Sequence, residues 1–156
     1  MKGIKWISGA VIAALVLPVL AQTADDPAIG TWKLNTAKSV IPASLGIKGM
    51  TRVYTHTPAG LALTETQEMT AGGTTTVKYS FRYDGKDSPV TGSSLYDSLA
   101  VKEVAKGKTD SVLKLKGATV GHSEREISKD GKVMSLTTML KVNGKEETLK
   151  YSFDKQ

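Results

Sequence analysis

The stretch Gly30-Thr31-Trp32-Lys33-Leu34-Asn35 begins a part of the chain in which strand-like patterns follow one another to the C-terminus. Trp32 and Leu34 lie on one face of this short stretch and polar residues lie on the other, which is the period-two alternation of a half-buried β-strand. We therefore expect it to be the first strand of an antiparallel β-domain.

The later runs repeat this pattern. The clearest spans Thr74 to Tyr83 and ends at Asp84-Gly85, a dipeptide typical of a tight hairpin turn. Lys86 to Asp97 reads as a short strand plus a loop, and Val40 to Lys48 as a loop that lies against the domain and covers one end of it. No helix-period segment is longer than one turn.

Strands joined by short turns pair antiparallel with their neighbours, which gives an up-and-down meander. An open sheet of about nine strands would leave two edges and a large uncovered apolar face, and closure removes both. The predicted fold is all-β, an antiparallel up-and-down meander of about nine strands closing into a barrel, with a β-sandwich as the alternative.

The N-terminus has the layout of a secretory signal peptide. Lys2 and Lys5 form a positive region, residues 7–20 form an uncharged apolar run, and Ala21 precedes the favoured cleavage point before Gln22. An uncleaved membrane anchor is the alternative, but the run is shorter than a bilayer span needs and Pro18 interrupts it. We expect a periplasmic or secreted protein without a stable membrane anchor, and the absence of Cys excludes a lipoprotein signal.

We divide the chain into a signal peptide (1–21), a flexible leader (22–29) and a single domain (30–156). Without the two lysines of the signal, the formal charge of +6 falls to +4. This charge is spread evenly, so it does not indicate a nucleic-acid-binding surface. An exported chain with no Cys has no disulfides and must be held together by packing and hydrogen bonds.

Gly30-Thr31-Trp32 resembles the Gly-x-Trp signature of the lipocalins and their calycin relatives. More closely, the chain resembles a family of small exported bacterial proteins that are lipocalin-like and of unknown function. The matching segments, in order, are Gly30 to Asn35, Ala37-Lys38-Ser39, Tyr83 to Asp87, Pro89 to Gly92, Arg125 to Ile127, Ser128 to Lys132 and Tyr151 to Gln156.

The resemblance implies a lipocalin-like barrel in which Gly30 and Trp32 close one end. In lipocalins the matching Trp packs against an Arg or Lys of a late strand, so Arg125 or Lys150 would supply a cation–π contact. The Thr-Asp-Tyr-like motif and the helix after the barrel that lipocalins carry are missing from this sequence. The resemblance therefore implies a barrel and does not imply a ligand.

Two sets of residues are candidates for ligand binding. Glu65 and Gln67 share a strand face with apolar residues, so they are cavity groups that orient a ligand if that face points inward, and solvated groups if it points outward. Tyr79 and Phe81 belong to an aromatic stripe that forms either core or the wall of an apolar pocket. Glu124-Arg125-Glu126 reads as a charged surface ladder with cross-strand partners.

No residue pattern predicts catalysis. His56 and His122 are the only histidines and lack metal-ligand spacing, and Gly92-Ser93-Ser94 does not fit a nucleophile elbow. We expect no metal, no cofactor and no enzymatic activity.

Two functions remain open. One is a barrel that binds a small apolar or amphipathic ligand, and the other is a non-catalytic protein-interaction module, an inhibitor or envelope-assembly factor, with a filled barrel. An enclosed apolar cavity of at least about 300 Å³ would favour the first, and a packed interior would favour the second.

Overall fold

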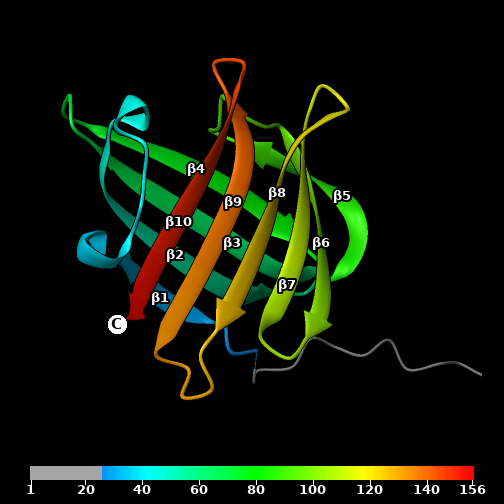
Figure 1. Cartoon of the computed structure of the whole chain (residues 1–156). Helices are drawn as coiled ribbons and strands as arrows, with labels where there is room; N and C mark the ends of the chain where they lie inside the picture. Colours follow the sequence, from blue (N-terminus) through cyan, green and yellow to red (C-terminus); the bar gives the residue numbers. More distant parts are fainter. Residues whose placement is uncertain (1–25) are drawn as a thin grey trace, which may run out of the picture.

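Ten antiparallel strands form a closed barrel (Figure 1). The computed structural model describes residues 26–156, so the predicted signal peptide and residues 22–25 lie outside the described residues. The strands are β1 (Gly30–Leu34), β2 (Ile47–Thr57), β3 (Gly60–Met69), β4 (Thr74–Phe81), β5 (Asp84–Thr91), β6 (Ser98–Ala105), β7 (Lys108–Leu115), β8 (Ala118–Ile127), β9 (Val133–Val142) and β10 (Lys145–Lys155).

The predicted closed meander is confirmed, with ten strands in place of about nine. The short first strand closes the cylinder, because Trp32 is in register with Arg52 of β2 on one side and with Lys155 of β10 on the other. The segment from Lys86 to Asp97, which contains Pro89, contributes most of a full strand, β5.

The two ends of the barrel differ. The end that carries the β6–β7 and β8–β9 turns lies at the bottom of Figure 1, and we call it the lower end. Apolar side chains fill it, and the largest of those that are fully buried are Trp32, Phe153, Leu61, Leu63 and Met134. The opposite end, here the mouth, carries the β7–β8 and β9–β10 turns.

Two three-residue 3-10 helices, η1 (Thr36–Lys38) and η2 (Ala43–Leu45), lie between β1 and β2. In the connection that contains η2, Ile41 and Leu45 pack against the core, as expected for a loop that lies against the domain, and so does Ile47 at the start of β2. Among residues 26–156, no helix is long and apolar enough to cross a membrane.

The segment just before β1 is packed, which corrects the flexible leader predicted for 22–29 in its described part. Ala28 is fully buried, and its carbonyl accepts a hydrogen bond of 2.8 Å from Trp32 Nε1. Asp26 accepts a hydrogen bond of 2.8 Å from the Tyr83 hydroxyl. These contacts attach the segment to the lower end of the barrel.

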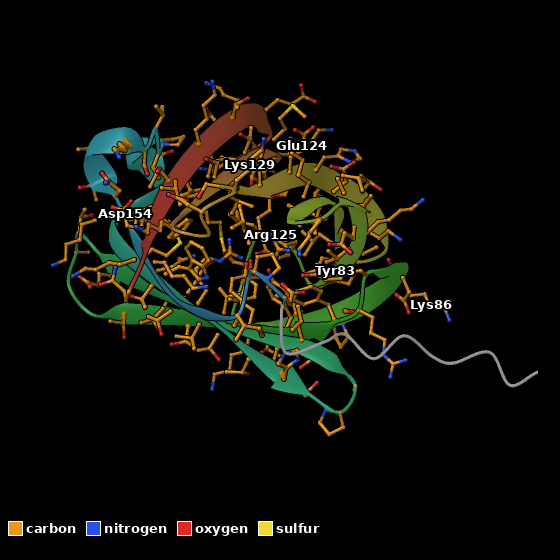
Figure 2. The ribbon with its side chains drawn as sticks, turned by 90° about the horizontal axis from the view of Figure 1, so that it is seen from below. Tyr83, Lys86, Glu124, Arg125, Lys129 and Asp154 are labelled. Carbon is orange, nitrogen blue, oxygen red and sulfur yellow. The ribbon has the colours of Figure 1, made fainter. Side chains whose placement is uncertain are left out.

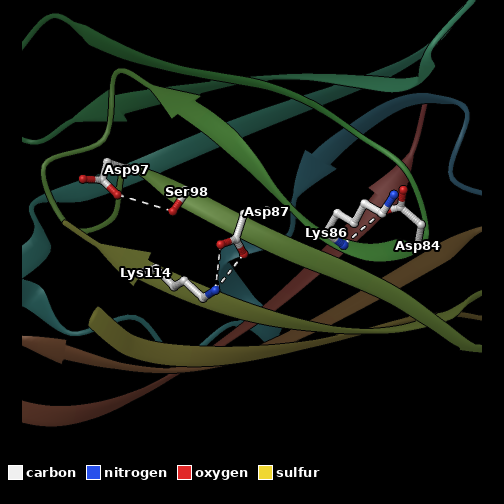
Figure 3. A network of polar contacts seen from close by, with 6 residues as sticks. All are labelled: Asp84, Lys86, Asp87, Asp97, Ser98 and Lys114. Carbon is white, nitrogen blue, oxygen red and sulfur yellow. Dashed lines mark hydrogen bonds and ion pairs between the residues drawn. The ribbon is translucent and has the colours of Figure 1, made fainter. Parts of the chain in front are cut away.

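The β4–β5 pairing is the shortest within the hairpins, with register partners only at Lys78–Thr91 and Tyr79–Val90. The rest of β5 is held from its other side, because it pairs with β6 and Asp87 forms an ion pair of 2.7 Å with Lys114 of β7 (Figure 3). The barrel stays closed here although β4 and β5 diverge toward the lower end.

A polar cavity inside the barrel as candidate functional site

A cavity of about 370 Å³ lies inside the barrel. Inward-facing residues from nearly every strand line it, together with Ser44 and Leu45 of η2 and residues 92–96 of the β5–β6 connection. Apolar lining residues contributed at the mouth include Leu45, Ile47, Met69, Leu95 and Val142. The charged lining residues are Arg52, Glu65 and Arg125.

Arg52 anchors the first polar group in the cavity. It is 4 % exposed, and its Nε lies 3.2 Å from Glu65 Oε2 while its Nη2 donates a hydrogen bond of 3.1 Å to the Tyr79 hydroxyl. Gln67 extends the group, because its Nε2 donates a hydrogen bond of 2.7 Å to Glu65 Oε1. One buried cation is thus paired with one buried carboxylate.

Arg125 anchors the second polar group. It is 6 % exposed, and its Nη2 donates a hydrogen bond of 2.9 Å to the Tyr83 hydroxyl, which in turn donates to Asp26. Figure 2 views the barrel from its lower end and shows Arg125 and Tyr83 inside the ring of strands, with Lys86 at its outer side. Arg125 therefore connects the cavity to the packed N-terminal segment.

The ring of Tyr54 links the two groups. Its centroid lies 5.5 Å from Arg52 Cζ and 5.4 Å from Arg125 Cζ, both within cation–π range. Two buried cations thus lie close to one aromatic ring, although β2 and β8 are not neighbours in the barrel.

The ionisation of these groups follows from their surroundings. Burial disfavours the charged guanidinium of Arg52 and of Arg125, but electrostatic interactions with Tyr54 and other neighbours outweigh it, so the pKa of both is raised. Burial raises the pKa of the hydroxyls of Tyr79, Tyr96 and Tyr151, which all line the cavity. At neutral pH the two arginines are therefore charged, and the hydroxyls of these three tyrosines are neutral.

The four residues that the sequence suggested for ligand contact all lie in the cavity wall: Glu65, Gln67, Tyr79 and Phe81. The shared face of Glu65 and Gln67 points inward, because period-two alternation continues along β3. Phe81 is 4 % exposed and packs edge-on to Tyr54, with 6.5 Å between their ring centroids.

The predicted closure of the barrel needs correction. Trp32 is fully buried at the lower end, but the cation over its ring is Lys155, with Nζ 5.1 Å from the centroid, and not Arg125 or Lys150. Gly30 adopts a φ of +126°, and a Cβ there would lie 3.0 Å from Lys155 Cε. Lys155 therefore packs over both residues of the Gly-x-Trp motif.

The charged ladder predicted for β8 is correct for Glu126, which forms an ion pair of 2.9 Å with Lys108 on the outer face, and wrong for Arg125. Strand alternation turns Arg125 inward between two exposed glutamates. Arg52 was not identified from the sequence. A signal was present, because Met50, Arg52 and Tyr54 alternate on one strand face.

The two histidines lie outside the cavity. His56 on β2 and His122 on β8 are both exposed, and β1, β10 and β9 separate the two strands. Within residues 26–156, no group of three or more His, Asp or Glu side chains is placed to hold a metal ion.

The fold and the site define a closed β-barrel whose cavity has both polar and apolar walls and contains three charged side chains. Neither a scan against models of known protein families nor a search of curated proteins finds a match to this chain.

Proposed function

We propose that this protein is an exported, lipocalin-like binding protein that holds a small amphipathic molecule inside its barrel. The observation that carries the proposal is the cavity of about 370 Å³. Its volume falls within the range of small-molecule sites, which begins at roughly 300 Å³.

The distribution of side chains supports an amphipathic ligand over a purely apolar one. Arg52, Glu65 and Arg125 supply a polar region, and apolar residues such as Leu45, Ile47 and Leu95 line the wall near the mouth. A molecule with a polar head and an apolar tail satisfies both regions, because a buried polar group needs a hydrogen-bond partner and an apolar wall favours apolar contact.

A matched pair of variants tests the location of binding. Thr75 lines the cavity, whereas the next residue, Thr76, is exposed on the outer face of the same strand. Thr75→Trp should occupy the cavity and abolish binding of the neutral fluorescent probe N-phenyl-naphthylamine, while Thr76→Trp should bind it as the natural protein does. Equal binding by both variants would contradict a site inside the barrel.

Export is part of the proposal and rests on the N-terminal sequence. The intact mass of the protein isolated from its own cells should correspond to a chain that begins at Gln22. Native mass spectrometry of the same sample should show a bound small molecule. Recovery of the full chain from Met1 would contradict cleavage, and protein that carries no small molecule and binds no probe would contradict the binding function.

A further inference from the structure

The charges around the cavity do not balance. Counted over residues 26–156, its wall contains two guanidinium groups, Arg52 and Arg125, and one carboxylate, Glu65, which leaves one positive charge in excess. All three side chains are more than nine-tenths buried. A buried charge without a partner is costly, and natural proteins pair such charges or bind a counter-ion.

Asp26 does not supply the missing negative charge within the cavity. Its carboxylate accepts a hydrogen bond from the Tyr83 hydroxyl and another from the Ala28 backbone N–H, both at 2.8 Å. It is partly exposed and is absent from the cavity wall, so it lies beyond Tyr83 as seen from Arg125. Because Asp26 is partly exposed, water screens its negative charge. Asp26 therefore does not neutralise the positive charge of Arg125 inside the barrel.

Donors on both arginines also lack partners. Arg52 Nη1 and Arg125 Nε are buried and have no hydrogen-bond partner within the described part of the chain, and Arg52 Nε, although close to Glu65, is outside hydrogen-bond geometry. Unsatisfied buried donors are uncommon in folded proteins, and both arginines thus offer free donors to an acceptor that enters the cavity.

From this we infer that the ligand carries one negative charge on its head group, of the carboxylate class, and that Arg52 and Arg125 select it. The inference rests on the proposed binding function and specifies the ligand of that site. A single negative charge balances the excess positive charge, and a carboxylate oxygen accepts hydrogen bonds from guanidinium and tyrosine hydroxyl donors. The tail of such a ligand lies along the apolar wall toward the mouth.

Other head groups fit the cavity less well. A cationic head would add to the excess positive charge, and the one carboxylate in the wall, Glu65, already interacts with Arg52 and Gln67. A neutral head would accept hydrogen bonds but leave the excess charge without a counter-ion. For ligands that share the same tail, we therefore expect the anion to bind most tightly, the neutral molecule less tightly and the cation most weakly.

Three probes that share one alkyl chain test this order by displacement of the neutral fluorescent probe: decanoate, decan-1-ol and decylammonium. We expect decanoate to bind at least about tenfold more tightly than decan-1-ol, which corresponds to one hydrogen bond to a charged group, and decylammonium to bind most weakly. Decan-1-ol or decylammonium binding as tightly as decanoate would overturn the inference and leave the binding function standing. Failure of all three to displace the bound probe would also overturn the inference, whereas a protein that does not bind the neutral probe at all would overturn the binding function as well.

A variant pair adds a second, independent readout. Glu65→Gln removes the one carboxylate that residues 26–156 place in the cavity wall and keeps a hydrogen-bonding side chain, so the ratio of decanoate affinity to decan-1-ol affinity should rise several-fold. Glu126→Gln removes an exposed carboxylate from the outer face and should leave this ratio unchanged. Folding of both variants is checked by circular dichroism. A ratio that is unchanged or lowered in a folded Glu65→Gln protein would contradict an anion site.

Discussion

Arg52 of β2 and Glu65 of β3 are register partners, and Arg52 Nε lies 3.2 Å from Glu65 Oε2 with both side chains almost fully buried. The pairing follows from a local feature, because Thr57 and Gly60 pair across the two-residue turn formed by Pro58 and Ala59. Every residue of β2 between Gly49 and Thr57 then meets a fixed partner on β3. A buried ion pair is thus built into one hairpin.

This pair predicts a non-additive effect on stability. Glu65→Leu alone leaves Arg52 buried without its carboxylate and should lower the free energy of unfolding by about 3–5 kcal/mol. The double variant Arg52→Met/Glu65→Leu replaces both charges by apolar groups and should be within about 1 kcal/mol of the natural protein, or more stable. Urea unfolding followed by circular dichroism measures both. A double variant as unstable as the single one would show that the two charges are not coupled.

We expect removal of the Trp32 side chain, which fills the lower end of the barrel, to destabilise the protein strongly. Its side chain is fully buried and its Nε1 donates to the Ala28 carbonyl, so Trp32→Ala should cost about 3–5 kcal/mol through lost packing and the cavity left behind. Lys155→Met removes the cation over the same ring and keeps the packed indole. This control variant should lower the free energy of unfolding by only about 0.5–1 kcal/mol. A loss below about 1 kcal/mol for Trp32→Ala in chemical denaturation would contradict its role as the plug of the barrel.

The fold could be predicted because it depends on local patterns. Period-two alternation and turn residues are visible in the sequence, and closure follows from the need to cover edges. The inward face of Glu65 and Gln67 could be read from the apolar residues beside them on β3. The short β4–β5 pairing could not, because it depends on how the distant β6 and β7 hold β5.

The two arginines show where sequence reasoning fails. Alternation alone places Arg52 and Arg125 inward, but burial of a lone charge is so unfavourable that the flanking glutamates of Arg125 favoured a surface interpretation. Their approach to the one ring of Tyr54 arises only when the barrel closes and brings β2 and β8 across the same interior. Residues of eight of the ten strands line the cavity, and no single segment contains it.

We expect that the shape of the mouth requires a glycine at position 92. It has a φ of +83°, and a Cβ there would lie only 1.9 Å from the Thr76 backbone oxygen. Gly92→Ala should therefore displace the connection that carries Leu95 and Tyr96 to the cavity. Gly72 has a similar φ of +91° with nothing nearby, so Gly72→Ala measures the backbone strain alone, about 1–2 kcal/mol.

The difference between the two glycine variants isolates the clash. Thermal and urea unfolding should show Gly92→Ala to be less stable than Gly72→Ala by about 1–3 kcal/mol, the usual cost of overpacking. Binding of the neutral fluorescent probe should weaken in Gly92→Ala and persist in Gly72→Ala. Equal stability and equal binding would mean that the connection moves aside without affecting the mouth.

The buried tyrosines predict a loss of stability at alkaline pH. Burial raises the pKa of Tyr79, Tyr83, Tyr96 and Tyr151 above the ordinary value near 10, so the folded state holds protons that the unfolded chain releases. Their contribution is fully present below about pH 10 and is lost as the pH rises toward the folded-state pKa, at about 1.4 kcal/mol per pH unit for each tyrosine. Lysines titrate in the same range, so the test is a comparison of the natural protein with Tyr151→Phe by urea unfolding between pH 8 and about pH 12. The free energy of unfolding should fall less steeply with pH in Tyr151→Phe than in the natural protein, and the difference in slope should correspond to about one proton. Identical slopes would contradict a hydroxyl kept neutral by the cavity.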